Sequence, residues 1–374
     1  NRVFMFNGGT RITQGNTFDN LSVRDLDDVQ MQSLVPLFEK LPPNGLNFGE
    51  TQGGGEAWWL GAPGKMAANE VFVFASFGFG GLTIASLLPG TVPYRNLLRG
   101  VRRLKALCDL NGMTLEVPAV DFDQGQANYG DSAVSDQASL TTLQAGLTTD
   151  INAILGTSGQ IPLMLRQATS WTVDADGYRM TQSLAMLGLV DHALANPTKF
   201  RLAGPQYSID GYAGDGVHML APGSRREGEY RGRSTERLRS AAASEGLVMT
   251  AVSNSGTAIT ITFNALTQIA IDTTLVSNPG QNGLRLVAPD GVTTIALSGI
   301  APSGTNMIVA TAASALTAGQ TYTMGVADVG TINQPAGPTT GPRSNIRDSS
   351  ADAASSGANL YNWAHCQRKT FVAS

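Results

Sequence analysis

One short segment carries an acid and a base at a spacing that suits catalysis. Asp215 and His218 stand three residues apart in the run Asp-Gly-Val-His, and the chain has only three histidines. A carboxylate at this distance can orient an imidazole ring and stabilise its charged form, as in the acid–histidine arm of a Ser-His-Asp hydrolase. The alternative is an incidental pair in a loop, because short motifs often occur by chance.

Two glycine-rich segments supply groups that could bind a developing negative charge. The first, GFGGLT, contains Gly80 and Gly81, and the second, QGQAN, begins at Gln124 and ends at Asn128. Glycine leaves the backbone N–H open to a ligand, and a neighbouring side-chain amide adds a further donor. Together these are the parts of an oxyanion hole. Each segment could also be a tight connection only, since glycine is a general turn residue.

Other common kinds of site have little support. The GFGG run does not match the GxGxxG pattern of dinucleotide-binding folds, and no GxxxxGK[ST] occurs. The two cysteines, Cys108 and Cys366, are too few for a disulfide framework, and no Cys/His spacing typical of a metal site is present. Tandem Trp58 and Trp59 could stack on a sugar, but packing in a core or interface is the stronger alternative.

An α/β unit has to position the candidate residues. Buried-strand patterns alternate with amphipathic helix patterns, which predicts βαβ units and a parallel sheet. Ligands bind beyond the carboxyl ends of such strands, where both glycine-rich segments stand. The charged helix that follows His218 holds six arginines interleaved with glutamates, and we expect a solvated, salt-bridged face there. The expected strands are 70–77, 114–122 and 161–165, and the expected helices are 94–110, 139–155, 178–196 and 224–240.

A second unit begins near residue 249, where the amino-acid composition changes. Residues 249–342 contain four charged residues and are rich in Thr, Ser, Ala and Gly. Short β-branched runs separated by turn dipeptides predict a small all-β sandwich. Residues 343–374 are polar and then aromatic, and we expect this tail to dock back on the first unit. The strands expected in the sandwich are 258–263, 284–288, 293–297, 306–311 and 320–326.

The order of the three motifs resembles the SGNH (GDSL-like) hydrolase superfamily, and most of all its sialate O-acetylesterase-like carbohydrate esterases. That family has a Gly-Gln-Ser nucleophile segment, a glycine block, a Q-G-E-x-[DN] block and a final D-x-x-H block. Gly80-Gly81, QGQAN with Gln126 in place of Glu, and Asp215 with His218 match the last three blocks. The resemblance covers roughly residues 1–240. It implies a flavodoxin-like parallel sheet flanked by helices over residues 1–248, and the β-sandwich predicted from the strand pattern follows at 249–342.

The nucleophile block of that family has no counterpart here, because no Gly-Gln-Ser occurs in the chain. The run Met5–Gly9 looks like the stretch that follows the nucleophile region. The resemblance therefore implies that the first strand and its serine precede residue 1. Ser76, at the end of the expected strand 70–77, is the internal alternative.

Two functions follow from the resemblance and from the missing block. The first is a carbohydrate O-acyl esterase, acting on acetyl groups through a Ser-His-Asp mechanism. In it His218 is the base, Asp215 orients the ring, and Gly81 with the Asn128 amide stabilises the oxyanion. No metal or organic cofactor is needed. The alternative is a non-catalytic carbohydrate-binding or structural protein on the same scaffold, such as a phage tail or spike component.

Composition restricts the partners. The net charge is −4, and charged residues make up 14%, against ~25% in an average soluble protein. This mild acidity argues against a nucleic-acid partner, and no apolar run approaches the ~20 residues that would insert in a membrane. The expected partner is an acylated carbohydrate or glycan, with a homo-oligomer or a virion assembly as the context. An extracellular or virion-surface location fits that partner.

Overall fold

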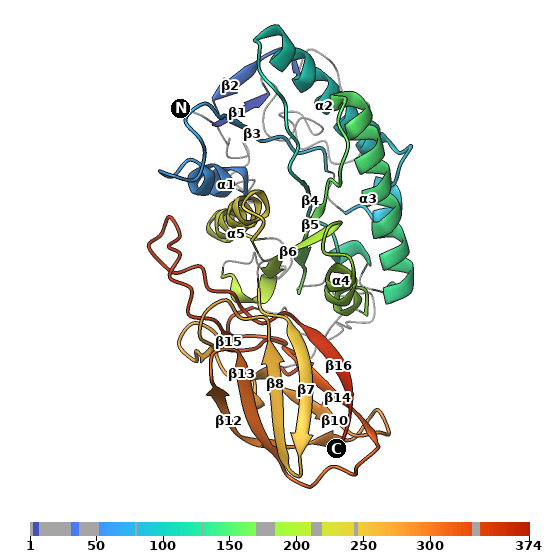
Figure 1. Ribbon diagram of the computed structural model, residues 1–374, viewed down its shortest axis with the longest axis vertical. Coiled ribbons are helices and arrows are strands. Elements are labelled where there is room, and N and C mark those ends of the chain that lie inside the picture. The colour runs from blue at the N-terminus through green and yellow to red at the C-terminus, as the bar shows by residue number, and fades with distance from the viewer. Residues whose placement is uncertain are drawn as a thin grey trace.

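The chain folds into an α/β unit and an antiparallel β unit placed end to end, as Figure 1 shows. The structure is a computed structural model. It describes residues 3–6, 31–36, 52–78, 81–128, 130–169, 184–210, 219–242, 246–330 and 337–374.

A parallel sheet of three strands forms the middle of the α/β unit. β4 (Val120–Phe122), β5 (Leu163–Gln167) and β6 (Phe200–Pro205) lie in the order β4-β5-β6, and both pairings are parallel. All five residues of β5 are buried, as expected for a central strand that is covered on both faces. The predicted parallel α/β architecture is therefore confirmed for these three strands. The full strand order of a flavodoxin-like sheet cannot be identified from these three strands.

A second small sheet corrects the prediction for residues 70–77. β1 (Val3–Phe6) pairs in parallel with β3 (Phe72–Val73) and antiparallel with β2 (Leu34–Pro36). The regular strand is shorter than expected: β3 contains Phe72 and Val73, the Phe74 N–H adds a hydrogen bond to the Phe4 carbonyl at 3.0 Å, and Ser76 forms an isolated bridge. Beyond it, the Phe77 ring lies directly against Gly100. The antiparallel β2 was not predicted, although such edge strands are common in otherwise parallel folds.

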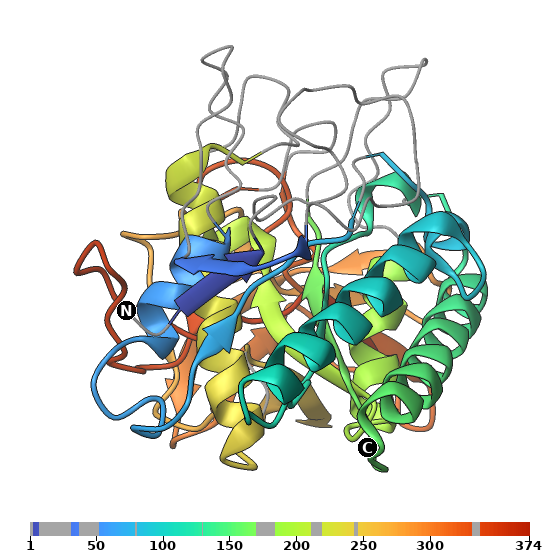
Figure 2. The same cartoon turned by 90° about the horizontal axis from the view of Figure 1, so that it is seen from above.

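Helices cover both faces of the parallel sheet, and Figure 2 shows α1 and α5 on the side opposite α2 and α3. The helices expected at 94–110 and 224–240 agree with the structure to within three residues at each end, the one expected at 139–155 begins six residues earlier, at Ala133, and α1 was not predicted. Local signals fix these ends: Ser132 caps α3 by accepting the Ser135 N–H at 3.2 Å, and Gly156 ends it with φ +69°. The helices are α1 (Gln52–Leu60), α2 (Val92–Leu110), α3 (Ala133–Leu155), α4 (Leu184–Ala195) and α5 (Ala221–Arg239), with 3₁₀ turns η2 (Ile84–Leu87), η3 (Gln126–Asn128), η4 (Gln206–Ser208) and η5 (Gln281–Gly283).

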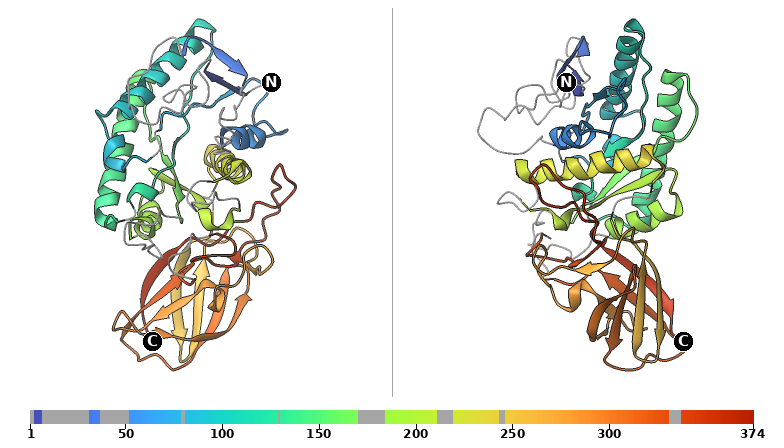
Figure 3. Two further views of the ribbon diagram at one scale, coloured as in Figure 1. Left: turned by 180° about the vertical axis from the view of Figure 1, so that it is seen from behind. Right: turned by 60° about the vertical axis from the view of Figure 1, so that its left-hand side comes forward.

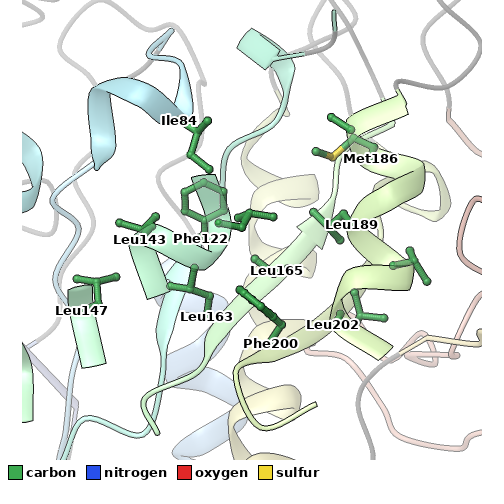
Figure 4. Packing of buried hydrophobic residues seen from close by; sticks show 14 of the residues in the cluster. Ile84, Phe122, Leu143, Leu147, Leu163, Leu165, Met186, Leu189, Phe200 and Leu202 are labelled. Carbon is green, nitrogen blue, oxygen red and sulfur yellow. The ribbon is translucent and has the colours of Figure 1, made fainter. Parts of the chain in front are cut away.

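The main hydrophobic core lies between the parallel sheet and helices α2, α3 and α4. Figure 4 shows Phe122, Leu163, Leu165 and Phe200 of the strands packed with helix residues such as Leu143. A separate cluster lies on the other face, where Trp59 of α1 is 4% exposed and Trp58 is 38% exposed. Trp59 is therefore a packing residue, in line with the alternative favoured from sequence.

Helix α5 is not the solvated helix that its charges predicted. Glu227, Glu229, Arg231 and Arg233 are all buried. The reason is that α5 packs closely against α1, while its charged groups meet opposite charges from the sheet and from the C-terminal tail. The prediction of a solvent-facing salt-bridged surface is therefore wrong for this helix.

The second unit consists of two antiparallel four-stranded sheets that share one core, visible at the bottom of Figure 1. Each of the five strands expected here overlaps an observed strand, while β7, β12 and β16 were not predicted. The first sheet has the order β12-β13-β8-β7, made of β12 (Leu297–Ser303), β13 (Met307–Ala312), β8 (Ala258–Phe263) and β7 (Met249–Ser255). The second has the order β11-β10-β14-β16, made of β11 (Thr294–Ile295), β10 (Arg285–Val287), β14 (Thr321–Val326) and β16 (Gln367–Val372).

The C-terminal tail contacts both units. β16 pairs with β14 in the second sheet, and β15 (Ile346–Arg347) pairs with β9 (Ala270–Ile271). Between these strands the tail runs beside α5, as the right-hand view of Figure 3 shows. There the Leu360 carbonyl and the Asn362 side chain accept hydrogen bonds from Arg233. The boundaries at 248 and 342 stay a prediction, since the tail belongs structurally to both neighbours.

Candidate active site

The candidate residues that the structure describes lie at the carboxyl end of the parallel sheet. β4 leads directly into the QGQAN segment, and β5 leads into Ala168 and Thr169. Gly81, Gln124 and Asn128 are described. Asp215, His218 and Gly80 lie outside the described residues, so the structure does not place the predicted acid–base pair.

Hydrogen bonds join the two glycine-rich segments. The backbone N–H of Ile84 donates to Asn128 Oδ1 at 2.9 Å, and Gln124 Nε2 donates to the Leu82 carbonyl at 3.2 Å. Gln124 Nε2 also donates to Asn128 Oδ1. Segments more than forty residues apart in the chain therefore meet, and the structure brings the Gly81 turn together with Gln124 and Asn128.

Asn128 is held in a single orientation. Its side chain is 4% exposed, its oxygen accepts the bonds from Ile84 and Gln124, and its Nδ2 donates to Asp131 Oδ2 at 2.6 Å. The Asn128 N–H also bonds to the Gly125 carbonyl at 3.0 Å, which closes the η3 turn. An amide nitrogen carries two hydrogens, and the Asp131 bond uses one of them. The arrangement can thus hold a second amide hydrogen in a fixed direction.

Glycine is required at positions 81 and 125 for two different physical reasons. Gly81 has φ +76°, a left-handed conformation that favours glycine, and nothing lies within 4 Å of where a Cβ would stand. Gly125 is needed for close approach, because a Cβ there would stand 3.1 Å from Met186 Sδ and 3.2 Å from Ala168 Cβ. The first glycine therefore shapes an exposed turn, and the second lets β4 and β5 continue side by side.

A buried carboxyl group lies next to the Asn128–Asp131 pair. Asp136, in the first turn of α3, is 2% exposed. Burial, and then repulsion from Asp131, raises the pKa of Asp136 to about 6. Asp131 accepts the hydrogen bond from the Asn128 amide, and its charge also raises the pKa of Asp136. Asp136 can therefore titrate near neutral pH.

Sequence reasoning missed a buried ionic network on the other face of the sheet. Arg166 of β5 pairs with Asp123, directly before Gln124, and with Glu227 of α5 at 2.7 Å. Arg231 of α5 lies 3.2 Å from Glu227 and 3.7 Å from both Asp121 and Asp123. The network thus connects the end of β4 to the helix that follows His218 in the chain. Its sequence signal was the Asp-Phe-Asp run at 121–123, whose first and last residues share one face of a strand.

The carboxylates of this network favour the charged form of Arg231 more than burial disfavours it. Burial alone would lower the pKa of Arg231, but Asp121, Asp123 and Glu227 together raise it above its ordinary value. Arg231 is therefore a permanent cation in the interior. A buried cation of this kind is stable only while its carboxylates stay in place.

Ser76 has no catalytic partner among the described residues. It is half-buried beside Gly78. The two described histidines bond elsewhere: His192 Nε2 lies 3.1 Å from the Thr141 hydroxyl, and His365 Nδ1 lies 3.2 Å from Gln167 Oε1. Since His218 lies outside the described residues, the structure does not test Ser76 as a nucleophile, and it stays an alternative.

Metal and membrane features are absent from the part of the chain that the structure describes. Within those ranges no group of three or more His, Cys, Asp or Glu side chains could hold a metal ion. No helix in those ranges is long and apolar enough to cross a membrane. A cavity of about 590 Å³ lies between α2 and α3, lined by residues such as Leu98, Arg102 and Ile154. None of the candidate residues lines this cavity.

Comparison with known proteins gives no sequence relative. No family model matches the chain, and no curated protein matches it. Among solved structures, a carbohydrate acetylesterase from Xanthomonas citri matches 93% of this chain and 74% of its own, with a TM-score of 0.55 and 14% identity. The chain is similar in fold to a carbohydrate acetylesterase.

This similarity confirms, at the level of the fold, the resemblance predicted from the motifs. An Arabidopsis thaliana protein matches 45% of this chain and 62% of its own, at 13% identity, but its TM-score of 0.34 is too low to support an argument. At these identities the similarity is one of fold.

Proposed function

We propose that the protein is a carbohydrate O-acetylesterase that works through a Ser-His-Asp mechanism on an SGNH-type flavodoxin-like scaffold. The main observation that supports the proposal is that hydrogen bonds of Gln124 and Asn128 connect the two glycine-rich segments. These segments meet at the carboxyl end of the sheet, in a fold similar to that of a carbohydrate acetylesterase. Isolated turn residues would have no reason to meet there.

The proposed reaction proceeds in two halves. The serine Oγ attacks the ester carbonyl carbon while His218 takes the serine proton, and the carbonyl oxygen becomes an oxyanion. His218 then gives this proton to the departing sugar oxygen as the C–O bond breaks. A water molecule attacks the acetyl-enzyme, again with His218 as base, and acetate leaves. Asp215 keeps the imidazole in the productive tautomer throughout.

In this proposal the oxyanion is stabilised by the Gly81 backbone N–H and by the second hydrogen of the Asn128 amide. The bonds from Ile84 and to Asp131 support this role, because they fix the Asn128 amide before the substrate arrives. A donor that is already oriented stabilises charge without the cost of reorganisation. The serine is supplied from outside residues 1–374, as the motif order implies.

The alternative is a non-catalytic carbohydrate-binding or structural protein on the same scaffold, for example a phage tail or spike component. The absence of a Gly-Gln-Ser motif from the 374 residues favours it, as does the Thr- and Ser-rich second unit. In that case the protein would assemble with copies of itself or with a virion and bind glycan without cleaving it.

His218→Ala separates the two proposals. In the full-length protein we expect this variant to lose about 10³-fold or more in acetate release from an acetylated sugar. His192→Ala is the matched control, because His192 lies on α4 and contacts Thr141 rather than the site. It should keep wild-type activity. Equal activity of His218→Ala and wild type would contradict the mechanism, and glycan binding without any hydrolysis would favour the alternative.

A further inference from the structure

Two buried polar atoms at the candidate site have no hydrogen-bond partner. They are the side-chain carbonyl oxygen of Gln124 and the hydroxyl oxygen of Thr169, both unpaired within the described part of the molecule. Gln124 is 9% exposed and Thr169 is 1% exposed. Buried polar atoms are nearly always paired, so two unpaired atoms in one region call for an explanation.

The two side chains come from neighbouring strand ends. Gln124 follows β4, Thr169 follows β5, and these strands are paired in parallel. Gly125 and Ala168 are in contact, since a Cβ on Gly125 would stand 3.2 Å from the Ala168 Cβ. Gln124 and Thr169 are each one residue away from this contact. Both unpaired atoms therefore belong to the same end of the sheet.

The direction of the Gln124 amide is set by its neighbours. Asn128 Oδ1 is fixed as an acceptor by the Ile84 N–H, and the Leu82 carbonyl is an acceptor by nature. Both face Gln124 Nε2, which uses its two hydrogens on them. The oxygen of the amide consequently has to lie on the other side, where it presents an acceptor.

Thr169 is likewise left with one unused group. Its backbone N–H donates to Gln206 Oε1 at 3.3 Å, so that donor is paired. The hydroxyl can donate one hydrogen bond and accept others. The site thus offers one fixed acceptor and one group that can act in either sense.

We propose that Gln124 Oε1 and Thr169 Oγ1 form a subsite that binds a hydroxyl group of the sugar. The proposal rests on the proposed function and names a substrate contact within it. A sugar hydroxyl can donate to Gln124 Oε1 and accept from the Thr169 hydroxyl, which satisfies both atoms. A carboxylate would face the Gln124 oxygen unfavourably, and an apolar group would leave both atoms unpaired. Gln124 is then an acceptor for substrate rather than an oxyanion donor.

Thr169→Val tests this subsite, because valine has nearly the shape of threonine and lacks the hydroxyl. We expect kcat/KM for an O-acetylated glucose, relative to that for p-nitrophenyl acetate, to fall about tenfold, mainly through KM. Thr169→Ser restores the hydroxyl and should recover most of this ratio. The free Thr169→Val protein should unfold at the same or a higher temperature than wild type, because it loses no hydrogen bond.

Ser234→Ala is the matched control. Ser234 is also buried, but its hydroxyl donates to the Leu202 carbonyl at 3.1 Å. It should lower the unfolding temperature and leave the substrate ratio unchanged, the opposite of Thr169→Val. An unchanged ratio in Thr169→Val, or a lower unfolding temperature, would overturn the subsite.

A second measurement separates this proposal from the proposed function. If the full-length protein hydrolyses neither ester, the esterase proposal fails and the subsite is judged by thermal shift with free glucose, galactose or N-acetylglucosamine. A sugar that stabilises wild type and Thr169→Ser, but not Thr169→Val, supports the subsite. Equal shifts in all three proteins, or no shift in wild type, would reject it.

Discussion

At the scale of single residues, Asp136 links stability to the candidate site. It is buried, its Oδ2 has no hydrogen-bond partner in the ranges described, and its pKa is raised to about 6 from an ordinary value of 3.8. A raised carboxyl pKa means that the folded protein binds the proton more tightly than the unfolded chain. The stability that comes from this proton is present below pH 3.8 and is lost as the pH rises through 6.

Asp136→Asn should therefore stabilise the protein in a pH-dependent way. A shift of about two pKa units corresponds to roughly 3 kcal/mol at most, since each unit is about 1.4 kcal/mol. We expect the variant to be more stable than wild type at pH 8 by an amount approaching this limit, because asparagine avoids a buried charge. The difference should vanish near pH 4, where Asp136 is protonated in the folded protein. Urea unfolding at the two pH values measures it, and a constant difference would contradict the assignment.

At the scale of elements, the packing of α1 against α5 fixes the position of the helix that follows His218 in the chain. α1 contains three consecutive glycines and is a poor helix by propensity, so tertiary packing has to hold it. Gly55 stands directly against the backbone of α5, and Gly232 of α5 stands against Glu56 and Trp59. Small residues at both positions let the two helices approach closely, and this close packing helps to bury the ion pairs of Glu227 and Arg231.

Gly55→Ala should disrupt this pair. A Cβ there would collide with the Arg225 carbonyl oxygen, which is backbone and cannot rotate away. We expect a loss of about 3 kcal/mol in the free energy of unfolding, at the upper end of typical overpacking costs. Gly130→Ala is the control, because a Cβ there meets nothing within 4 Å, and it should change stability by less than about 1 kcal/mol. Equal stability of the two variants in chemical denaturation would contradict the close packing.

The elements also show what sequence could and could not predict. The helices at 94–110 and 139–155 were predicted well because one apolar face repeats along each of them. The burial of α5 was not predictable, because its charges are neutralised by Asp121, Asp123 and Asp352, which come from distant parts of the chain. The meeting of Gln124 and Asn128 with the Gly81 turn was expected from the motif order. The unpaired oxygen of Gln124 was not, because it depends on which neighbours are acceptors.

At the scale of the whole molecule, the tail joins the two units through buried polar contacts. Asn362 is 3% exposed, accepts from Arg233 of α5 at 2.9 Å, and donates to Asp348 Oδ2 at 2.7 Å. Its oxygen also accepts the Gly246 N–H, at the entrance to the β-sandwich. Nearby, the Tyr207 hydroxyl donates to the Ala364 carbonyl. An interface that depends on such bonds resists separation, because either unit alone would leave buried charges unpaired.

The α/β unit and the β-sandwich should therefore unfold together. We expect one calorimetric transition in which the calorimetric and van't Hoff enthalpies agree. Asn362→Ala should lower the temperature of this single transition, because it removes one hydrogen bond from the Arg233 guanidinium and one from the Asp348 carboxylate. The cost should be about 3 kcal/mol, the upper range for bonds to charged groups. Asn254→Ala, a surface contact of the second unit, should shift the transition far less. Two resolved peaks in wild type would show that the units fold separately and that the tail is a tether rather than a shared element.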